Sequence, residues 1–448
     1  MSIETKTTQE RIVRLAASNN STNQYLSDQL LKRYGTNRKS EIIGKIGNNG
    51  QPYQELLNGN LTTGYISNSG VLLEDFETVG DWTVSGAGAT VEADATNFRT
   101  GTKGLKVTSV NAVAAVARKN VSLDLSTTEV FSIWTYIHDL TKITTSGFSH
   151  LFFYTGAADA YSVSLFSPHL SLQTGWNKLL VHKNDFVVAT GTPNWANSVV
   201  QIRIRCLSLA GETASLTVDE LRIGEQSRPK IIVTFDDGNA TDYTEAYSYM
   251  ESKGLKGILF VPAANVGEVN QITLAQMQEM YADGWDMGNH SYNHIDLTDL
   301  TYEEALEEIA SDTAYLVTNG MSRGSNFLAY PLSALNATVV QAAIDAGIIL
   351  ARSGVAGVNA HDNPLKLKLK RREALNTSLL SDFTGWIDNC IDTGGVLIFN
   401  FHDIVTPAVA GTNCTVEIFQ GVIDYLKTKV DADALDVVTM TEWYTGLT

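Results

Sequence analysis

Between residues 71 and 224 the chain alternates apolar and polar residues in short runs, such as LKVTSV, SIWTYI and QIRIRC. Clusters of Gly, Asn, Thr and Ser separate these runs. Alternation with a period of two is typical of strands that bury one face, and turn residues at such spacing are typical of antiparallel sheets. The pattern predicts an all-β sandwich over residues 71–224.

Beyond a short linker, from residue 229 to 448, longer apolar runs alternate with helical segments. The runs are KIIVTF, KGILFVP, WDMGNH, NFLAYP, GIILARS, GVLIFNF and DVVTM. One helix is well delimited, because Thr301 and Glu304 form a capping box at its start and Asn319-Gly320 closes it. The alternation of strand and helix predicts an irregular (β/α) barrel, so the chain is α/β in its C-terminal half and multidomain as a whole.

The first 70 residues differ from both of these regions. They are polar and Asn-rich, and they hold two helix-like stretches, TTQERIVRLAAS and NQYLSDQLLKRYG. Their 8 Lys and Arg outnumber 5 Asp and Glu, although the whole chain is acidic. Too few apolar residues are present for an independent core. We expect a helical arm over residues 1–70 that serves attachment or oligomerisation.

Composition narrows the classes of function. The 448 residues are 44 % hydrophobic and 18 % charged, which indicates a globular protein. A net charge of -17 makes nucleic acid an unfavourable partner, and it favours a neutral polymer over an anionic one. Cys206, Cys390 and Cys414 have no spacing that would suit a metal site or a disulfide framework, so we expect buried thiols. We see no apolar run long enough to span a membrane, and no N-terminal export signal.

Polar residues that suit chemistry follow four of the predicted barrel strands. Asp236 and Asp237 come after KIIVTF, and His290 and His294 come within and after WDMGNH. Pro331 follows FLAY, and His402 follows LIFNF. The carboxyl ends of barrel strands meet at one end of the barrel, so these side chains are expected to converge. Two carboxylates and three imidazoles are the groups that a metal-assisted hydrolytic site needs. A solvated Asp-Asp-Gly turn and histidines buried at strand ends are the alternatives.

Single residues carry weaker signals. The two histidines of HSYNH are four residues apart, and on a helical turn they would project from one face toward one cation. Trp82, Trp176 and Trp195 of the predicted sandwich offer aromatic faces that suit a sugar ring. For each tryptophan a place in the sandwich core is the favoured alternative.

Four motifs together resemble the polysaccharide deacetylase family of carbohydrate esterases. They are TFDDG (234–238), HSYNH (290–294), AYPLS (329–333) and FNFHDI (399–404), in the order and approximate spacing of that family. The resemblance spans residues 229–448. The sandwich region resembles jelly-roll carbohydrate-binding modules, in LLEDFETVGDWTV, FRTGTKGLKVTS, GWNKLLV and LTVDELRIG.

The deacetylase resemblance implies a role for each matching residue. Asp237, His290 and His294 would bind a divalent ion, usually Zn²⁺, and Asp236 would be the general base. The backbone N–H of Leu332 would stabilise the oxyanion, and His402 would protonate the leaving group.

One motif departs from the family. Many members carry an arginine before the proline of the third motif, where it orients the catalytic aspartate, but Ala329 and Tyr330 precede Pro331 in this chain. Arg371 or Arg372 could supply that cation, and a solvated basic strand end is the alternative. Tyr330 is a further candidate for substrate contact.

The predicted function is metal-dependent removal of N- or O-acetyl groups from a polysaccharide. The alternative is a sugar-binding structural or adhesive protein with a decayed barrel. Such polymers lie outside cells, so an extracellular site of action is expected, and the lack of a visible signal suggests a virus particle such as a bacteriophage tail. Residues 1–70 would then bind a second copy of the chain or a virion partner.

Overall fold

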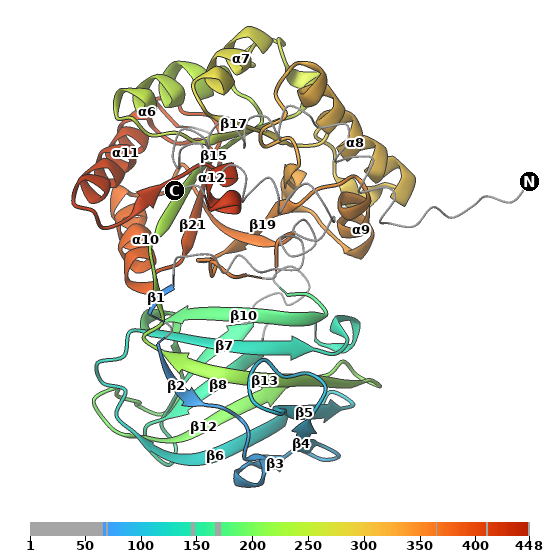
Figure 1. Ribbon diagram of the computed structural model, residues 1–448, viewed down its shortest axis with the longest axis vertical. Coiled ribbons are helices and arrows are strands. Elements are labelled where there is room, and N and C mark those ends of the chain that lie inside the picture. Colours follow the sequence, from blue (N-terminus) through green and yellow to red (C-terminus); the bar gives the residue numbers. More distant parts are fainter. Residues whose placement is uncertain are drawn as a thin grey trace, which may run out of the picture.

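The computed structural model describes residues 66–68, 70–144, 148–165, 172–363, 365–408 and 411–446. The helical arm expected over residues 1–70 therefore lies almost wholly outside the described residues. Figure 1 shows two bodies, a β-sandwich and a barrel ringed by helices. The connecting strand β14 (Gln226–Ser227) pairs with β1 (Ile66–Asn68), so the chain leaves the sandwich beside the point where it entered.

Two six-stranded antiparallel sheets form the sandwich. The first sheet has the order β10-β7-β13-β5-β4, and β2 also pairs with β13. Its strands are β10 (Gly175–His182), β7 (Val130–Ile137), β13 (Thr213–Ile223), β5 (Gly104–Val110), β4 (Thr90–Asp94) and β2 (Val71–Glu74). The second sheet consists of β11 (Val187–Thr190), β9 (Ala160–Leu165), β8 (Phe148–Tyr154), β12 (Val199–Cys206), β6 (Ala115–Leu123) and β3 (Thr83–Ser85), in that order.

Alternate residues of both sheets meet in one hydrophobic core. Phe131 of β7, Phe153 of β8 and Ile204 of β12 are fully buried in it. Along each strand the residues that alternate with these point away from the core, because successive side chains of a strand point to opposite faces. The sequence pattern therefore fixes which side chains of QIRIRC lie inside and which lie outside.

Seven parallel strands close into a barrel, because β15 pairs with β21 on one side and with β16 on the other. They are β15 (Lys230–Asp236), β16 (Ile258–Val261), β17 (Asp286–Asn289), β18 (Phe327–Ala329), β19 (Leu350–Ala356), β20 (Leu369–Glu373) and β21 (Val396–Phe401). A short strand, β22 (Asp436–Val437), pairs with the start of β15. The predicted irregular barrel is confirmed.

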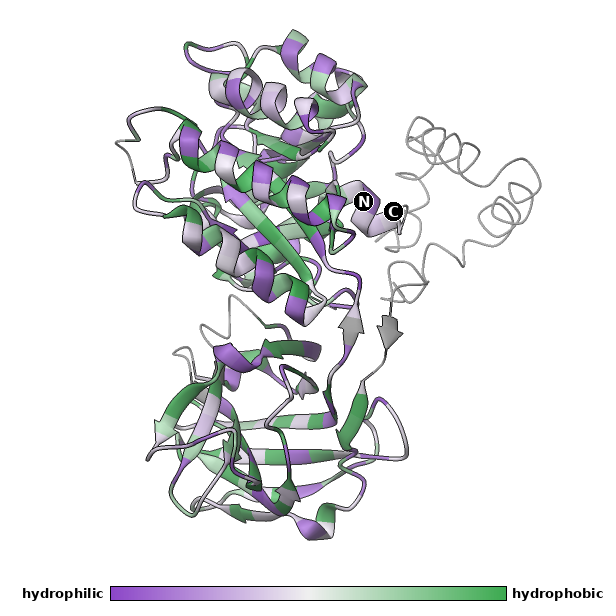
Figure 2. Ribbon diagram, turned by 90° about the vertical axis from the view of Figure 1, so that its left-hand side faces the viewer, coloured by the Kyte–Doolittle hydropathy of each residue, from purple (hydrophilic) through white to green (hydrophobic). Residues whose placement is uncertain are grey.

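Helices surround this barrel, with their polar sides outward (Figure 2). They are α6 (Ser248–Ser252), α7 (Leu274–Ala282), α8 (Tyr302–Thr318), α9 (Ala337–Asp345), α10 (Leu380–Thr393) and α11 (Val416–Asp431). The capping box of Thr301 and Glu304 starts α8, and Asn319 caps its end, as the sequence predicts.

The last helix, α12 (Met440–Thr445), packs at the amino-terminal end of the barrel strands. Its Met440 and Trp443 are buried against Ile232 and Ile258, and the Thr441 N–H donates to the Asp286 carboxylate at 2.8 Å. Asp286 is the first residue of β17, so α12 covers the end from which the strands start (Figure 1). The opposite end, where the strands finish, is left for the site.

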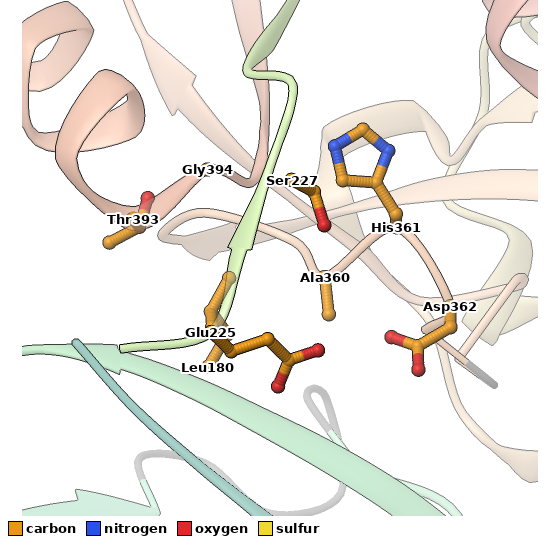
Figure 3. A pocket seen from close by; sticks show the side chains of 8 residues that line it. All are labelled: Leu180, Glu225, Ser227, Ala360, His361, Asp362, Thr393 and Gly394. Carbon is orange, nitrogen blue, oxygen red and sulfur yellow. The ribbon is translucent and has the colours of Figure 1, made fainter. Parts of the chain in front are cut away.

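Sandwich and barrel join through a polar contact. The Lys178 ammonium of β10 donates to Glu225 at 2.5 Å and to Asp362 at 2.9 Å. Figure 3 shows these two carboxylates turned toward each other across a small pocket at the junction, which His361 also lines. Lys178 and Glu225 are both buried, so this contact lies inside the molecule.

The three cysteines are free and buried, as expected from their spacing. Cys206 lies in the sandwich core, whereas Cys390 and Cys414 lie in the barrel core.

Candidate active site

Two adjacent carboxylates end the first barrel strand. Asp236 is the last residue of β15 and is only 4 % exposed. Asp237 follows with a φ of 73°, a left-handed conformation that is costly for a residue with a Cβ atom. This reversal turns the Asp237 side chain toward the histidines that follow β17, and Gly238, with a φ of 69°, continues the turn.

His290 and His294 follow β17 in a loop, and not on a helical turn as their spacing of four suggested. Ser291 and His294 have positive φ values of 57° and 54°. The Ser291 hydroxyl accepts the His294 N–H at 3.1 Å, which folds the loop back on itself. The imidazoles meet because of this strained loop, with ring centroids 4.7 Å apart.

The buried imidazole of His290 is held by the strands around it. Its Nδ1 lies 2.7 Å from the carbonyl oxygen of Ala329, at the end of β18. A carbonyl only accepts, so Nδ1 carries the proton and the Nε2 lone pair is free to face Asp237. The fully buried Asp312 of α8 accepts the backbone N–H groups of His290 and Ala263, each at 2.9 Å, which ties this loop to the next strand end. The sequence analysis did not find Asp312.

Three ligand atoms converge between these loops. Nε2 of His290 lies 3.4 Å from Oδ1 of Asp237, and Nε2 of His294 lies 3.1 Å from the same atom. That oxygen is buried and has no hydrogen-bond partner of good geometry among the described residues. Lone pairs of two imidazoles and a carboxylate directed at one point repel each other unless a cation lies between them. The donor set therefore fits a divalent ion such as Zn²⁺.

Electrostatics of the cluster follow from the same geometry. Burial acts to raise the pKa of Asp237, but the imidazoles of His290 and His294 hold it well below its ordinary value. The Asp237 carboxylate beside its ring raises the pKa of His294. Asp237 is therefore an anion at any physiological pH, as a metal ligand has to be.

Arg352 supplies the cation beside Asp236. Its Nη2 donates to both carboxylate oxygens, at 2.6 and 2.5 Å. Burial acts to raise the pKa of Asp236, but Arg352, together with His290 and His402, holds it below its ordinary value. Arg352 lies on β19, inside the apolar run GIILARS. A charged residue inside a buried run needs a partner, and that signal could have identified Arg352 from the sequence.

The prediction that Arg371 or Arg372 orients the base is wrong. Arg371 pairs with Glu373 at 2.9 Å and donates to the Ser333 hydroxyl at 3.0 Å. The Arg372 guanidinium lies over the ring of Trp386, on the side of β20 that faces α10. Alternation along β20 sends these two residues to opposite sides of the strand, and neither contacts Asp236.

His402 lies just beyond the end of β21, with Nε2 3.9 Å from Oδ2 of Asp236. Burial lowers its pKa and outweighs the attraction of the two aspartates. Leu332, in the turn after β18, has a left-handed backbone with φ 54° and ψ 13°. Its side chain is 67 % exposed, so the backbone and not the side chain is the part of Leu332 fixed by the fold.

Three of the four candidate substrate-binding aromatics are misassigned. Tyr330 is 3 % exposed and lies in the core between the barrel and helices α8 and α9. Trp82 is 4 % exposed and stacks on Phe76, and Trp195 is stacked between Tyr161 and Phe131. All three are structural because apolar neighbours cover their ring faces. Trp176 is half-buried beside Trp134 and Tyr136 on the outer side of the first sheet.

Comparison with known proteins finds a family that is similar to part of the barrel. Residues 223–351 match the sequence profile of the family described as polysaccharide deacetylase, and this range includes every residue of the metal-ligand cluster. Over these residues the barrel is therefore similar to the polysaccharide deacetylase family. The matched range includes Asp236 and the loop that bears both histidines, and it ends one residue before Arg352.

Curated relatives match this part of the chain. The putative polysaccharide deacetylase YxkH of Bacillus subtilis (strain 168) is 26 % identical over 155 residues, which is 35 % of this chain and 54 % of YxkH. A probable peptidoglycan-N-acetylglucosamine deacetylase of Arthroderma benhamiae is 29 % identical over 118 residues, 26 % of each chain. The matched region thus spans about half of the first relative and a quarter of the second.

Among solved structures, the Streptococcus pyogenes deacetylase PplD in complex with acetate is 26 % identical, with a TM-score of 0.29. That match covers 30 % of this chain and 60 % of PplD. Within the described residues, no helix is both long and apolar enough to cross a membrane.

Proposed function

We propose that this protein is a metal-dependent hydrolase that removes acetyl groups from a polysaccharide outside the cell. The observation that carries the proposal is the position of Asp236. Its carboxylate is buried, is held by Arg352, and has Oδ2 3.9 Å from Nε2 of both His290 and His402. An ionised base beside a three-ligand cluster is the arrangement that hydrolysis of an acyl group requires.

Asp237, His290 and His294 are the residues that hold the ion, and Zn²⁺ suits one carboxylate and two imidazoles. When bound, a divalent ion lowers the pKa of a ligated water and polarises the acetyl carbonyl. The Ala329 carbonyl supports this role, because it fixes the His290 tautomer with Nε2 unprotonated and facing Asp237, where it would bind the ion.

The other residues handle protons and charge. Asp236 takes a proton from the attacking water, whose oxygen bonds to the acetyl carbon. The N–H of Leu332 donates to the carbonyl oxygen as negative charge develops there. His402 gives a proton to the departing oxygen or nitrogen of the sugar as its bond to the acetyl carbon breaks. The products are acetate and a free hydroxyl or amino group.

Arg352 gives this scheme its geometry. With Nη2 across both oxygens, it keeps Asp236 ionised and fixes the plane of the carboxylate. Asp236 is thus ready to accept a proton at neutral pH. Amide and ester substrates need the same groups, so N-acetyl and O-acetyl sugars are both within the proposal.

Acetate release tests the proposal. The purified protein is incubated with acetylated chitin oligomers, acetylated xylan and acetylated bacterial capsule, with and without a chelator, and free acetate is measured. We expect release from at least one polymer, loss of release with chelator, and recovery when Zn²⁺ is restored.

Two variants separate chemistry from folding. Asp236→Asn removes the base and should lower release at least about a hundred-fold, whereas Glu303→Gln removes an exposed carboxylate of α8 and should change nothing. No release from any polymer with any divalent metal would contradict the proposal and favour a non-catalytic sugar-binding protein.

A further inference from the structure

Three arginines lie together on the outer face of the second sandwich sheet. Arg118 of β6 is the direct cross-strand neighbour of Arg203 on β12, and Arg205 follows two residues along β12 on the same face. Their strand neighbours Ala117, Ile202 and Ile204 are buried in the core, so the arginines point away from it. We call Arg118, Arg203 and Arg205, with Phe152 and Tyr154 of β8, the arginine face.

The three cations have no carboxylate partner within the part of the chain that the structure describes. Among the described residues, none of them forms an ion pair, and the only side-chain hydrogen bond is from Arg203 Nε to Gln201. Nε of Arg118 and Nε of Arg205 are buried without any acceptor. Like charges placed directly opposite on neighbouring strands destabilise a sheet, so the cluster has a cost that the fold itself does not offset.

The region that carries the arginine face is much less acidic than the barrel region. Residues 225–448 carry 13 Lys and Arg against 30 Asp and Glu, whereas residues 71–224 carry 11 against 14. The net charge of -17 therefore belongs to the barrel region, and the sandwich is close to neutral. The overall charge predicted a neutral partner, but the arginine face is locally cationic, which favours an anion there.

Aromatic rings border the cations. The Arg203 guanidinium lies over the Tyr154 ring, 3.6 Å from its centroid, and Phe152 is the cross-strand neighbour of Arg203. The stacking on Tyr154 and the bond to Gln201 fix the guanidinium, and Nη1 and Nη2 have no acceptor among the described residues. A fixed guanidinium fork matches a carboxylate in two parallel hydrogen bonds, and half-buried rings beside it suit the apolar face of a sugar.

We propose that the arginine face binds an acidic polysaccharide through the carboxylates of its uronic acid units. Three cations on a nearly neutral sandwich suit a polymer whose negative charges are spaced apart. Nucleic acid carries a phosphate at every nucleotide, so the acidic barrel would repel it. The choice of a polysaccharide also rests on the proposed function of the barrel. The pairings and ring contacts of these five residues lie within the sandwich, so the face binds polymer independently of the reaction.

Binding to matched polymers tests this site. The full chain is titrated with polygalacturonate and with its methyl ester, which has the same backbone without charge. We expect the acid to bind at least about ten-fold more tightly than the ester, with affinity that falls as salt rises. The triple variant Arg118→Gln, Arg203→Gln, Arg205→Gln should lose at least about ten-fold in affinity for the acid.

A second triple variant controls for overall charge. Lys103→Gln, Lys106→Gln, Lys142→Gln removes three cations elsewhere on the sandwich and should bind the acid within about two-fold of the wild type. If the arginine triple fails to fold, by circular dichroism and thermal unfolding, Arg203→Gln alone replaces it. Arg203→Lys keeps the charge but loses the planar guanidinium, so its affinity for the acid should lie between those of the wild type and Arg203→Gln.

Several outcomes overturn the proposal. They are equal affinity for acid and ester, equal affinity of the wild type and the arginine triple, or tighter binding of a single-stranded oligonucleotide. Binding of polygalacturonate is also measured with Asp236→Asn, because binding to the arginine face does not depend on acetate release. Suppose that the protein binds polygalacturonate but releases no acetate from any acetylated polymer. The proposal for the arginine face would then stand and the proposed function would be contradicted, so the two failures are distinguishable.

Discussion

Arg352 holds both carboxylate oxygens of Asp236 through one nitrogen, at 2.6 and 2.5 Å, although the two residues are 116 positions apart in the chain. Both side chains are almost completely buried. Removing one member of a buried ion pair leaves the other without a partner, so this contact controls the state of Asp236. Arg352 thus contacts Asp236 as the arginine of the third motif does in many members of the family that the sequence resembles.

Replacement of Arg352 should reduce turnover. We expect Arg352→Ala to lower kcat about a hundred-fold with little change in KM, because the carboxylate loses its orientation and its charge partner. Arg352→Lys should retain a higher kcat than Arg352→Ala, since an ammonium supplies the charge but not the planar set of donors. Steady-state acetate release measures both variants.

The control for this prediction is Arg372→Gln, which removes the neighbouring candidate cation that lies over Trp386. Its kcat should equal that of the wild type. A large loss in Arg372→Gln, or none in Arg352→Ala, would contradict the assignment.

Removal of the histidines should abolish metal binding. We expect His290→Gln and His294→Gln each to lower Zn²⁺ affinity at least about a hundred-fold, because two of three ligand atoms cannot hold the ion. Zinc content after dialysis and calorimetric titration measure the effect. His138→Gln, a histidine of the sandwich, should bind zinc as the wild type does.

The sandwich should lose stability in acid through His150. Burial lowers the pKa of His150 to about 4 from an ordinary 6.5, and the neutral ring contacts the Arg205 carbonyl and the Thr135 hydroxyl. The unfolded chain binds the proton first, so this contribution is complete above pH 6.5 and is lost as pH falls to 4, by about 3 kcal/mol in total.

Hydrogen exchange of the β7 and β8 amides in the full chain measures this loss. His150→Gln cannot titrate, so its protection should change less between pH 7 and pH 4 than that of the wild type. Identical pH dependence in the two proteins would show that His150 has no part in it.

Loss of Lys178 should weaken the junction between sandwich and barrel. Lys178→Met leaves Glu225 buried with Ser132 as its one side-chain partner among the described residues, and we expect a loss of about 3–5 kcal/mol in urea unfolding. Lys178→Met with Glu225→Gln should recover much of it. Lys427→Met breaks an exposed pair with Asp431 and should change stability by less than about 1 kcal/mol.

The sequence predicted much of the fold because periodicity is a local property. Alternation in QIRIRC and the capping box at Thr301 both specify structure over a few residues, and both are found as expected. The strand ends also placed Asp236, Asp237, His290, His294 and His402 in one region, because parallel strands of a barrel finish at the same end.

Partners that come from distant strands could not be predicted in this way. The choice among Arg352, Arg371 and Arg372 depended on which side of its strand each residue faces and on how β19 and β20 follow around the barrel. The loop geometry of HSYNH likewise depended on contacts with α8 and β18. Neither kind of contact leaves a periodic signal.

The sequence by itself thus determined the strands, the helices and the set of reactive groups, since these follow from local hydrophobic pattern and residue type. Only the tertiary structure decided which cation holds Asp236 and which aromatic rings are buried. It also decided that three arginines from two strands form one face with no carboxylate partner among the described residues. These depend on register and closure, which bring together residues that are far apart in the chain.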